Sequence, residues 1–240
     1  MNLIIDIGNS GTKLAVFSGE EKIASARHEH LSSDSLEEFT TDRPIAKIIV
    51  SSVKDIPQLI SEFAEKRSIK LFILSHRSKL PFSICYQTPE TLGPDRIAAV
   101  AGAFKAFPGS KALVIDAGTA ITYDFLEGDK YMGGNISPGI DMRFRALNKF
   151  TGRLPLMSRT DDFSSPGANT GDAIIAGVVN GVVYEINEYI RTFEEKHKDL
   201  KVIITGGDSI FLRERIIEGS IYLPDIVTDG LNYILEYNAK

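Results

Sequence analysis

The segment Leu3-Ile4-Ile5-Asp6-Ile7-Gly8-Asn9-Ser10 has a close counterpart in the middle of the chain, Leu113-Val114-Ile115-Asp116-Ala117-Gly118-Thr119-Ala120. Each is an apolar run rich in β-branched residues that ends in Asp, with a glycine two residues later. After each come two more extended segments, separated by a turn that contains glycine and acidic residues (18–21 and 127–130). Glycine between extended runs is typical of β-hairpins. The repeat therefore predicts two halves that begin with the same three strands.

Further along, both halves change to alternating strands and helices. We predict strands over 46–53, 70–75 and 202–205 and helices over 56–67, 95–107, 140–150, 170–195 and 208–218. This alternation indicates parallel βαβ connections. The prediction is an α/β protein of two similar domains, 1–108 and 109–240, divided at a turn-rich stretch. Because ligands of open α/β sheets bind beyond the strand ends, we expect a ligand cleft between the halves, where both Asp-x-Gly turns lie.

Composition excludes several classes of protein. In 240 residues, Lys and Arg number 27 and Asp and Glu 32, so the net charge of -5 argues against binding nucleic acid by bulk electrostatics. Cys85 is the single cysteine, which excludes an intrachain disulfide and a multi-cysteine zinc site. The apolar stretch over 173–183 is too short to cross a bilayer. We expect a cytoplasmic protein with neither a nucleic acid nor a membrane as partner.

The first Asp-x-Gly segment has the composition of a phosphate loop. It reads Asp6-Ile7-Gly8-Asn9-Ser10-Gly11-Thr12-Lys13. Two glycines let the backbone approach a bulky anion, and the amides, the two hydroxyls and Lys13 can all donate to phosphate oxygens. Asp6 would repel phosphate unless Mg²⁺ bridged the two groups. The alternative is that Asp6 caps its own tight hairpin.

Three further glycine-containing segments could contact a nucleotide. The second copy, 116–120, offers a carboxylate and hydroxyls that suit a hard cation or the far side of a polyphosphate. Thr205-Gly206-Gly207-Asp208 follows a strand and could approach a base or ribose, although Asp208 could also be a helix N-cap. Segment 133–139 joins a strand to a helix whose first amides could face an anion.

The tetrapeptide Gly93-Pro94-Asp95-Arg96 opens a helix of small residues. Asp95 could accept a proton from a hydroxyl while Arg96 holds a carboxylate or phosphate. The alternatives are an N-cap for Asp95 and a surface ion pair for Arg96. Tyr86 alone would more often be a packed strand residue.

Taken together, these motifs resemble those of type III pantothenate kinases, in the actin-like and sugar-kinase ATPase superfamily. The resemblance covers essentially the whole chain and rests on 6–13, 93–96, 116–120, 133–139, 169–170 and 205–208. It departs from the family at Pro94, where alanine is common, and at Ser10, where threonine is usual. Proline is tolerated at a helix start, and serine keeps the hydroxyl.

The resemblance implies two actin-like (ribonuclease H-like) domains, each with a mixed five-stranded sheet, and phosphorylation of pantothenate by ATP in the first step of coenzyme A synthesis. It implies Asp95 as general base and Asp116 as ligand of a monovalent cation, K⁺ or NH₄⁺. Asp6 is expected to hold Mg²⁺ through ATP. The remaining implied contacts are Asp6, Ile7, Gly8, Asn9, Ser10, Gly11, Thr12, Lys13 and Thr119 with ATP, and Tyr86, Gly93, Pro94, Asp95, Arg96 and Thr170 with pantothenate.

The family also implies a homodimer with the pantothenate site at or near its interface. A stripe of Ala176, Gly177 and Gly181 in the predicted helix 170–195 would allow another helix to approach closely. Two alternatives stay open: a sugar or carboxylate kinase of the same superfamily, and a nucleotide-dependent regulator. The first should carry a sugar-binding motif that is not found, and the second should lack an aspartate such as Asp95.

Overall fold

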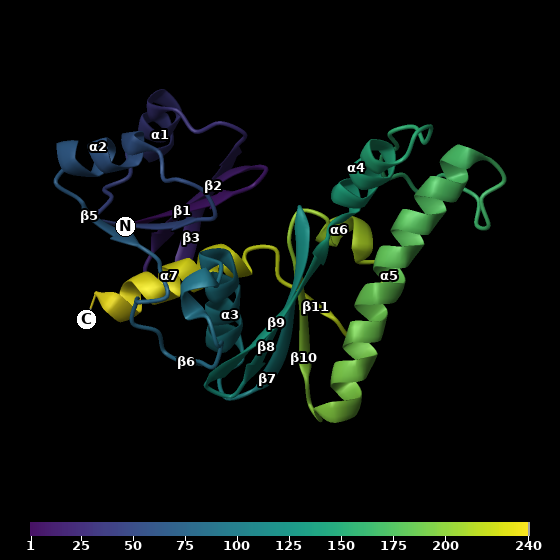
Figure 1. Cartoon of the computed structure of the whole chain (residues 1–240). Helices are drawn as coiled ribbons and strands as arrows, with labels where there is room; N and C mark the ends of the chain where they lie inside the picture. The colour runs from purple at the N-terminus through teal and green to yellow at the C-terminus, as the bar shows by residue number, and fades with distance from the viewer. Residues whose placement is uncertain (240) are drawn as a thin grey trace. The chain divides into compact units, whose positions relative to one another are not determined.

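The computed structural model describes residues 1–239 and shows an α/β chain with two mixed sheets (Figure 1). The first sheet has the order β3-β2-β1-β4-β5. Its strands are β1 Asn2–Gly8, β2 Gly11–Ser18, β3 Glu21–His28, β4 Lys47–Ser52 and β5 Lys70–Ile73. β1 is antiparallel to β2 and parallel to β4, so a double hairpin leads into a parallel βαβ arrangement, as the sequence predicts.

The second sheet has the order β11-β10-β7-β8-β9-β6. Its strands are β7 Lys111–Ala117, β8 Ala120–Glu127, β9 Lys130–Pro138, β10 Lys201–Thr205, β11 Ile221–Tyr222 and β6 Ser83–Ile84. The strands from β9 to β11 repeat the order of the first sheet, which confirms the internal repeat. The predicted count of five strands is wrong here, because β6 from the first half pairs in parallel with β9 and adds a sixth.

The described residues also form seven α-helices. They are α1 Ser33–Thr40, α2 Gln58–Lys66, α3 Pro94–Ala106, α4 Ile140–Phe150, α5 Thr170–Lys196, α6 Ser209–Leu212 and α7 Ile226–Asn238, with a 3₁₀ turn over Pro89–Thr91. The predicted helix over 208–218 is wrong beyond Leu212. In a continuing helix the Ile217 N–H would donate to the carbonyl of Arg213. It donates instead to the side chain of Asn187 in α5, at 2.9 Å.

By contacts, the chain forms two compact units. One contains Met1–Gly109, Leu126–Gly133 and Asp225–Lys240, and the other Ser110–Phe125 and Gly134–Pro224. The predicted division into 1–108 and 109–240 differs from these units in two segments, the hairpin tip and the C-terminal helix. The reason for the second difference is that α7 packs tightly on α3, where a Cβ on Gly230 would lie 1.9 Å from the Ala98 carbonyl oxygen.

The two faces of the first sheet have different roles. Leu3, Ile5 and Ile7 of β1 point into a core that includes residues of α1 and α2. Side chains alternate along a strand, so Asn2, Ile4 and Asp6 point the other way. Asn2 donates to Asn232 of α7 at 2.8 Å, which identifies that face as the one covered by α7. Asp6 therefore lies on the α7 face of the sheet.

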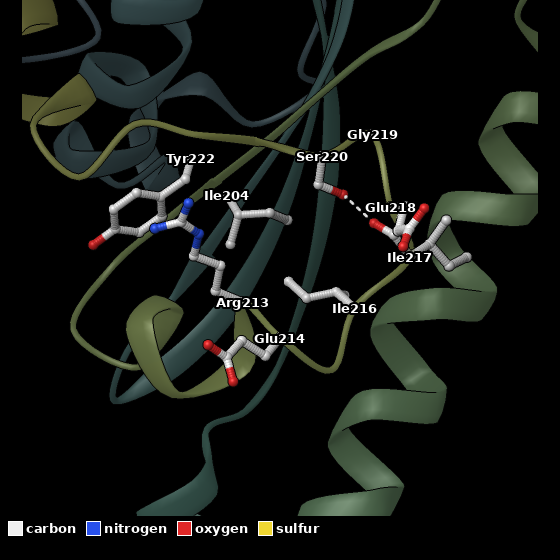
Figure 2. Close-up of a pocket in the computed structure, with 9 residues that line it drawn as sticks. All are labelled: Ile204, Arg213, Glu214, Ile216, Ile217, Glu218, Gly219, Ser220 and Tyr222. Atoms are coloured by element: carbon white, nitrogen blue, oxygen red, sulfur yellow. Dashed lines mark hydrogen bonds between the residues drawn. The ribbon is translucent and has the colours of Figure 1, made fainter.

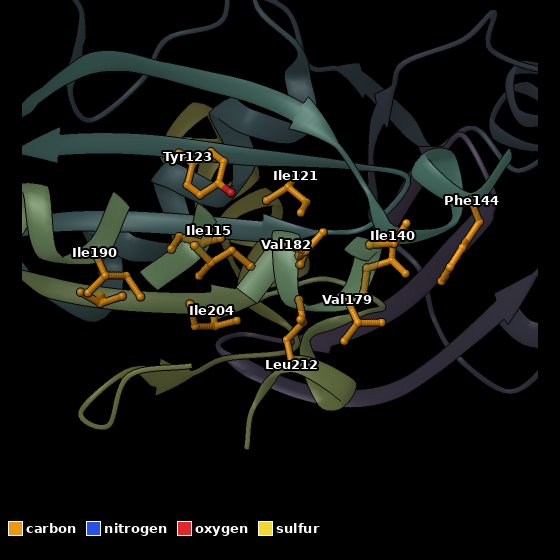
Figure 3. Close-up of a cluster of buried hydrophobic side chains, with 14 of the residues drawn as sticks. Ile115, Ile121, Tyr123, Ile140, Phe144, Val179, Val182, Ile190, Ile204 and Leu212 are labelled. Carbon is orange, nitrogen blue, oxygen red and sulfur yellow. The ribbon is translucent and has the colours of Figure 1, made fainter. Parts of the chain in front are cut away.

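In the second unit, α5 covers the sheet and supplies much of the core. Val179, Val182 and Ile190 of this helix pack with Ile115 of β7 and Ile204 of β10 (Figure 3). None of the helices in the described part of the chain is long and apolar enough to cross a membrane.

Candidate active site

The predicted phosphate loop is the tight connection between β1 and β2. Asp6 pairs with Lys13 and Gly8 with Gly11, so Asn9 and Ser10 form the exposed tip. Gly11 has φ of 147°, and a Cβ there would lie 2.8 Å from the His28 carbonyl oxygen. Only glycine suits this position, which explains why the loop can present its backbone at the surface.

Asp6 stands in a strained electrostatic environment. The pKa of Asp6 is raised to about 6, mainly by burial and also by the nearby negative charge of Asp95, while the hydrogen bond with Ser51 and the charge of Lys13 lower it. The two aspartates are therefore close enough to repel each other. A divalent cation held partly by phosphate oxygens and water would relieve that repulsion, and one or two carboxylates are what Mg²⁺ takes from a protein. The residues present thus fit the predicted magnesium ion.

Asp95 lies in the first turn of α3, but it is not the N-cap, because that position belongs to Gly93. Its Oδ1 accepts the backbone N–H of Arg96 at 2.8 Å. Burial raises the pKa of Asp95, and Arg96 only partly offsets that effect. A carboxylate with a raised pKa accepts a proton more readily than an exposed one, so Asp95 has the properties of a general base.

Arg96 is only 5% exposed, which contradicts the surface ion-pair alternative. Its guanidinium lies over the ring of Tyr86, 5.7 Å from the centroid. The same tyrosine ring packs against Gly133, where a Cβ would come within 3.1 Å of it. The first unit thus brings together the aromatic ring, the arginine and Asp95.

A pocket of about 680 Å³ lies beside the start of α3. It is lined by Ser52, Val53, Lys54 and Asp55 after β4, and by Glu90, Thr91, Leu92, Gly93 and Pro94. Lys54 also donates to the Asn9 carbonyl at the tip of the phosphate loop, at 2.7 Å. The sequence did not predict a role for Lys54, because a single lysine after a strand belongs to no recognisable motif. It brings a positive charge to the backbone of that loop.

In the second unit, glycine-containing segments meet around Asp116. Gly206 has φ of 94°, and a Cβ there would lie 2.4 Å from Asp116 Oδ1. The Gly139 N–H donates to the Thr119 carbonyl at 3.1 Å, and a Cβ on Gly139 would lie 2.0 Å from the Gly118 carbonyl oxygen. The carboxylate of Asp116 and the backbone of 117–119 are therefore in contact with both other glycine motifs.

Asp208 occupies the N-cap position of α6, but its side chain makes no hydrogen bond to the first amides of that helix. Its carboxylate instead accepts a hydrogen bond from Arg159. Burial raises the pKa of Asp208 more than Arg159 lowers it. The N-cap alternative is therefore right about the position of this residue, while its side chain binds Arg159 instead of the helix amides.

The two units hold different parts of the predicted site. Residues 6–13, Tyr86 and 93–96 belong to the first, whereas Asp116, Thr119 and Thr170 belong to the second. Thr170 is the first residue of α5, and its N-cap Asn169 accepts the Asp172 N–H at 2.9 Å. Within residues 1–239, no cluster of three or more His, Cys, Asp or Glu side chains could hold a metal ion.

A separate pocket of about 240 Å³ contains none of the predicted site residues (Figure 2). It lies between the end of β10, the segment after α6 and β11, where Arg213 lies over the ring of Tyr222, 5.6 Å from its centroid. Ser220 closes one side through a hydrogen bond to the Ile217 carbonyl at 3.1 Å.

Solved structures, several of them named as sugar kinases, share the fold of this chain. It aligns with a putative N-acetylmannosamine kinase from Listeria monocytogenes at a TM-score of 0.58 and 13% identity, over 100% of this chain and 99% of the other. A putative Baf family transcriptional activator from Campylobacter jejuni aligns at a TM-score of 0.62 and 26% identity, over 99% and 98%.

Sequence comparison narrows the class to one family. The family model for type III pantothenate kinase matches residues 2–192. A type III pantothenate kinase of Phocaeicola vulgatus is 42% identical over 100% of both chains, and one of Bacteroides fragilis is 42% identical over 99% of this chain and 98% of its own. The chain belongs to the type III pantothenate kinase family.

Proposed function

We propose that this chain transfers the γ-phosphoryl group of ATP to the primary hydroxyl of pantothenate, giving 4'-phosphopantothenate and ADP in the first step of coenzyme A synthesis. The hydroxyl oxygen forms a bond to the γ-phosphorus as the bond to the β–γ bridging oxygen breaks, and the hydroxyl proton leaves to a base. The observation that carries the proposal is that the carboxylates of Asp6 and Asp95 lie close enough to influence each other beside a glycine hairpin, within a chain that belongs to this family.

Residues 6–13 are proposed to hold the ATP phosphates. Three observations support this role. Asn9 and Ser10 form an exposed tip, Lys13 lies opposite Asp6 in the strand register, and Lys54 donates a hydrogen bond to the Asn9 carbonyl of the loop. Asp6 would hold Mg²⁺ through ATP, and the bound ion would neutralise charge on the β- and γ-phosphates. Thr119, in the other unit, is the remaining proposed ATP contact.

Asp95 is proposed as the base that orients the pantothenate hydroxyl and accepts its proton. Its burial in the first turn of α3 and its raised pKa support this role. Gly93, Pro94 and Arg96 would surround the substrate, and Tyr86 would form its apolar wall. Arg96 is buried, so its charge can act on the pantothenate carboxylate with little screening by water. Thr170 would complete the contacts.

Asp116 is proposed to bind a monovalent cation, K⁺ or NH₄⁺. The support is the chemistry of the donors: a carboxylate next to backbone carbonyls that the close approach of Gly206 and Gly139 brings to one place. Oxygen donors of this kind suit a hard cation.

A homodimer is proposed because of an apolar groove between α4 and α5. The groove has a volume of about 720 Å³ and is lined by Arg143, Ala146, Leu147, Leu154, Thr170, Ala173, Ile174, Gly177 and Val178. Of the predicted small-residue stripe, Ala176 is buried, but a Cβ on Gly177 or Gly181 would meet nothing within 4 Å. The two glycines leave room for a second copy, and Thr170 at the groove would place the substrate contact near the interface.

The first experiment is a coupled assay of ADP release with pantothenate, ATP and Mg²⁺, in potassium and in sodium, on the natural chain and on Asp95→Asn. We expect turnover that needs pantothenate and potassium, and a loss of at least about a hundredfold in kcat for Asp95→Asn, because general-base catalysis contributes on that order. Asp95→Asn should still bind pantothenate in calorimetry.

Turnover by Asp95→Asn at the rate of the natural chain would remove Asp95 from the role of base. Equal rates in sodium and potassium would overturn the cation proposal at Asp116. No turnover with any pantothenate or ATP concentration would favour a regulator, which is the role that the name of the Campylobacter jejuni protein gives to that relative.

A further inference from the structure

The C-terminal helix carries a carboxylate that contacts the lysine of the phosphate loop. Asp225 immediately precedes α7, and its Oδ1 accepts a hydrogen bond from Lys13 Nζ at 2.9 Å. Its other oxygen accepts from Lys22 of β3. Burial raises the pKa of Asp225, but the two lysines outweigh that effect and leave the pKa below its usual range. At neutral pH, a fixed negative charge therefore lies beside Lys13.

The helix behind Asp225 is anchored without the help of Lys13. Asn2 of β1 donates to Asn232 at 2.8 Å, and Lys47 of β4 donates to Glu236 at 3.0 Å. Gly230 lets α7 lie directly against α3. Because these contacts fix α7 on the sheet, Asp225 offers Lys13 a partner whose position does not depend on the lysine itself.

Lys13 lies between this partner and Asp6. It pairs with Asp6 across the β1–β2 ladder, and its charge lowers the pKa of Asp6. A lysine side chain has a flexible stem of four carbons and about 2 kcal/mol of rotamer entropy, so an unrestrained ammonium would sample many positions. The bond to Asp225 restricts those positions before any phosphate arrives.

We propose that Asp225 is a positioning residue for phosphoryl transfer, which orients the Lys13 ammonium toward the transferred phosphoryl group. The proposal rests on the proposed role of Lys13 as a contact of the ATP phosphates. Lys22 neutralises the charge of Asp225, so the set of two lysines and one carboxylate keeps a net positive charge. Asp225 can therefore orient Lys13 without cancelling its attraction for phosphate.

A positioning role predicts a particular split of the kinetic constants for Asp225→Asn. We expect kcat to fall about tenfold, because a loosely held ammonium stabilises the transition state less well. KM for ATP should stay the same or fall, because removal of a negative charge beside the site strengthens its attraction for a polyanion. A merely structural defect would instead lower the amount of folded enzyme, and it would not combine a lower kcat with an unchanged or lower KM for ATP.

The test compares kcat and KM for ATP in the natural chain, Asp225→Asn, Asp225→Glu, Lys13→Met and the double variant of Asp225→Asn with Lys13→Met, with thermal unfolding of each. Asp229→Asn is the matched control. It removes a half-buried carboxylate from the next turn of α7 whose charge also acts on Lys13 and Lys22, although no ion pair in the described chain joins it to either lysine. It therefore separates loss of charge from loss of the contact, and its kcat should equal that of the natural chain. Asp225→Glu should retain most of the kcat, and the double variant should be no slower than Lys13→Met alone.

Three results would overturn the proposal: a kcat for Asp225→Asn equal to that of Asp229→Asn, a raised KM for ATP with kcat unchanged, or losses that multiply in the double variant. A different result marks failure of the proposed function. If Lys13→Met keeps both kcat and KM for ATP, Lys13 does not contact the phosphates, and its positioning by Asp225 has no role in the reaction.

Discussion

At the scale of single residues, the candidate site depends on two aspartates that the fold forces together. Asp6 ends a buried strand and Asp95 opens a helix that covers the same face of the sheet, and burial raises the pKa of both. In both, burial makes the charged form less favourable than it is in water. The proposed role of Asp6 in holding Mg²⁺ needs its charged form, so the free enzyme would keep an electrostatic strain that the bound ligand would relieve.

This strain gives a stability that depends on pH. The pKa of Asp6 is raised from 3.8 to about 6, so its contribution to stability is fully present below about pH 4 and is lost as the pH rises through 6. Asp6→Asn keeps the shape without the charge. Its free energy of unfolding, relative to the natural chain, should therefore increase by about 2 kcal/mol between pH 4.5 and pH 8.

Urea denaturation of both proteins at the two pH values measures this difference. Asp6→Asn should also lose turnover, so it would be more stable and inactive at pH 8. An identical difference in unfolding free energy at both pH values would show that Asp6 is not destabilised by its charge.

At the scale of elements, the contact of α3 with α7 supports the site. The helices approach so closely that a Cβ on Gly230 would overlap the Ala98 carbonyl oxygen, and one on Gly102 would lie 2.2 Å from the Ile226 carbonyl oxygen. Asp95 is in the first turn of α3 and Asp225 directly precedes α7. The relative position of these two carboxylates therefore depends on how closely the helices pack.

Gly230→Ala should lower the free energy of unfolding by about 2 kcal/mol. Overpacking typically costs about 1–3 kcal/mol, and it outweighs the roughly 1 kcal/mol by which alanine favours a helix over glycine. Gly177→Ala is the matched control, since a Cβ there meets nothing within 4 Å, and it should stabilise the protein slightly. Urea denaturation measures both. A Gly230→Ala protein as stable as Gly177→Ala would show that the helices can separate at no cost.

At the scale of the whole molecule, the long helix α5 has two faces with different partners. One face packs into the core of the second unit, and the other leaves Gly177 exposed and Tyr184 68% exposed. Large apolar grooves on a protein surface commonly mark an interface.

Gly177→Arg should convert the proposed homodimer to a monomer, because the arginine side chain fills the groove without a clash inside one chain. Light scattering after gel filtration measures the mass. Glu194→Arg, on an exposed part of α5 outside the groove, is the control and should remain dimeric. A dimeric Gly177→Arg protein would exclude this groove as the interface, and a monomeric natural chain would exclude the homodimer itself.

The sequence alone determined the repeated strand order and the loop at Asp6, because a hairpin depends on residues that are neighbours in the chain. The apolar runs rich in β-branched residues, the Asp-x-Gly segments that follow them and the glycine turns are each visible over a few positions. The capping box of α1, formed by Ser32 and Ser35, is local in the same sense. The helix over 208–218 is shorter than its pattern predicts, since its end depends on a side chain of α5.

Only the tertiary structure decided which distant residues meet. It placed α7 with the first unit rather than the second, added β6 to the edge of the second sheet, and set Asp225 against Lys13. It also showed that the side chain of Asp208, at the N-cap of α6, binds Arg159 and not the helix amides. These contacts join residues far apart in the chain, and they form because burying the apolar face of α7 against α3 and β1 fixes its polar end beside the phosphate loop. No local sequence pattern predicts that Asp225 meets Lys13, because this contact follows from the packing of α7.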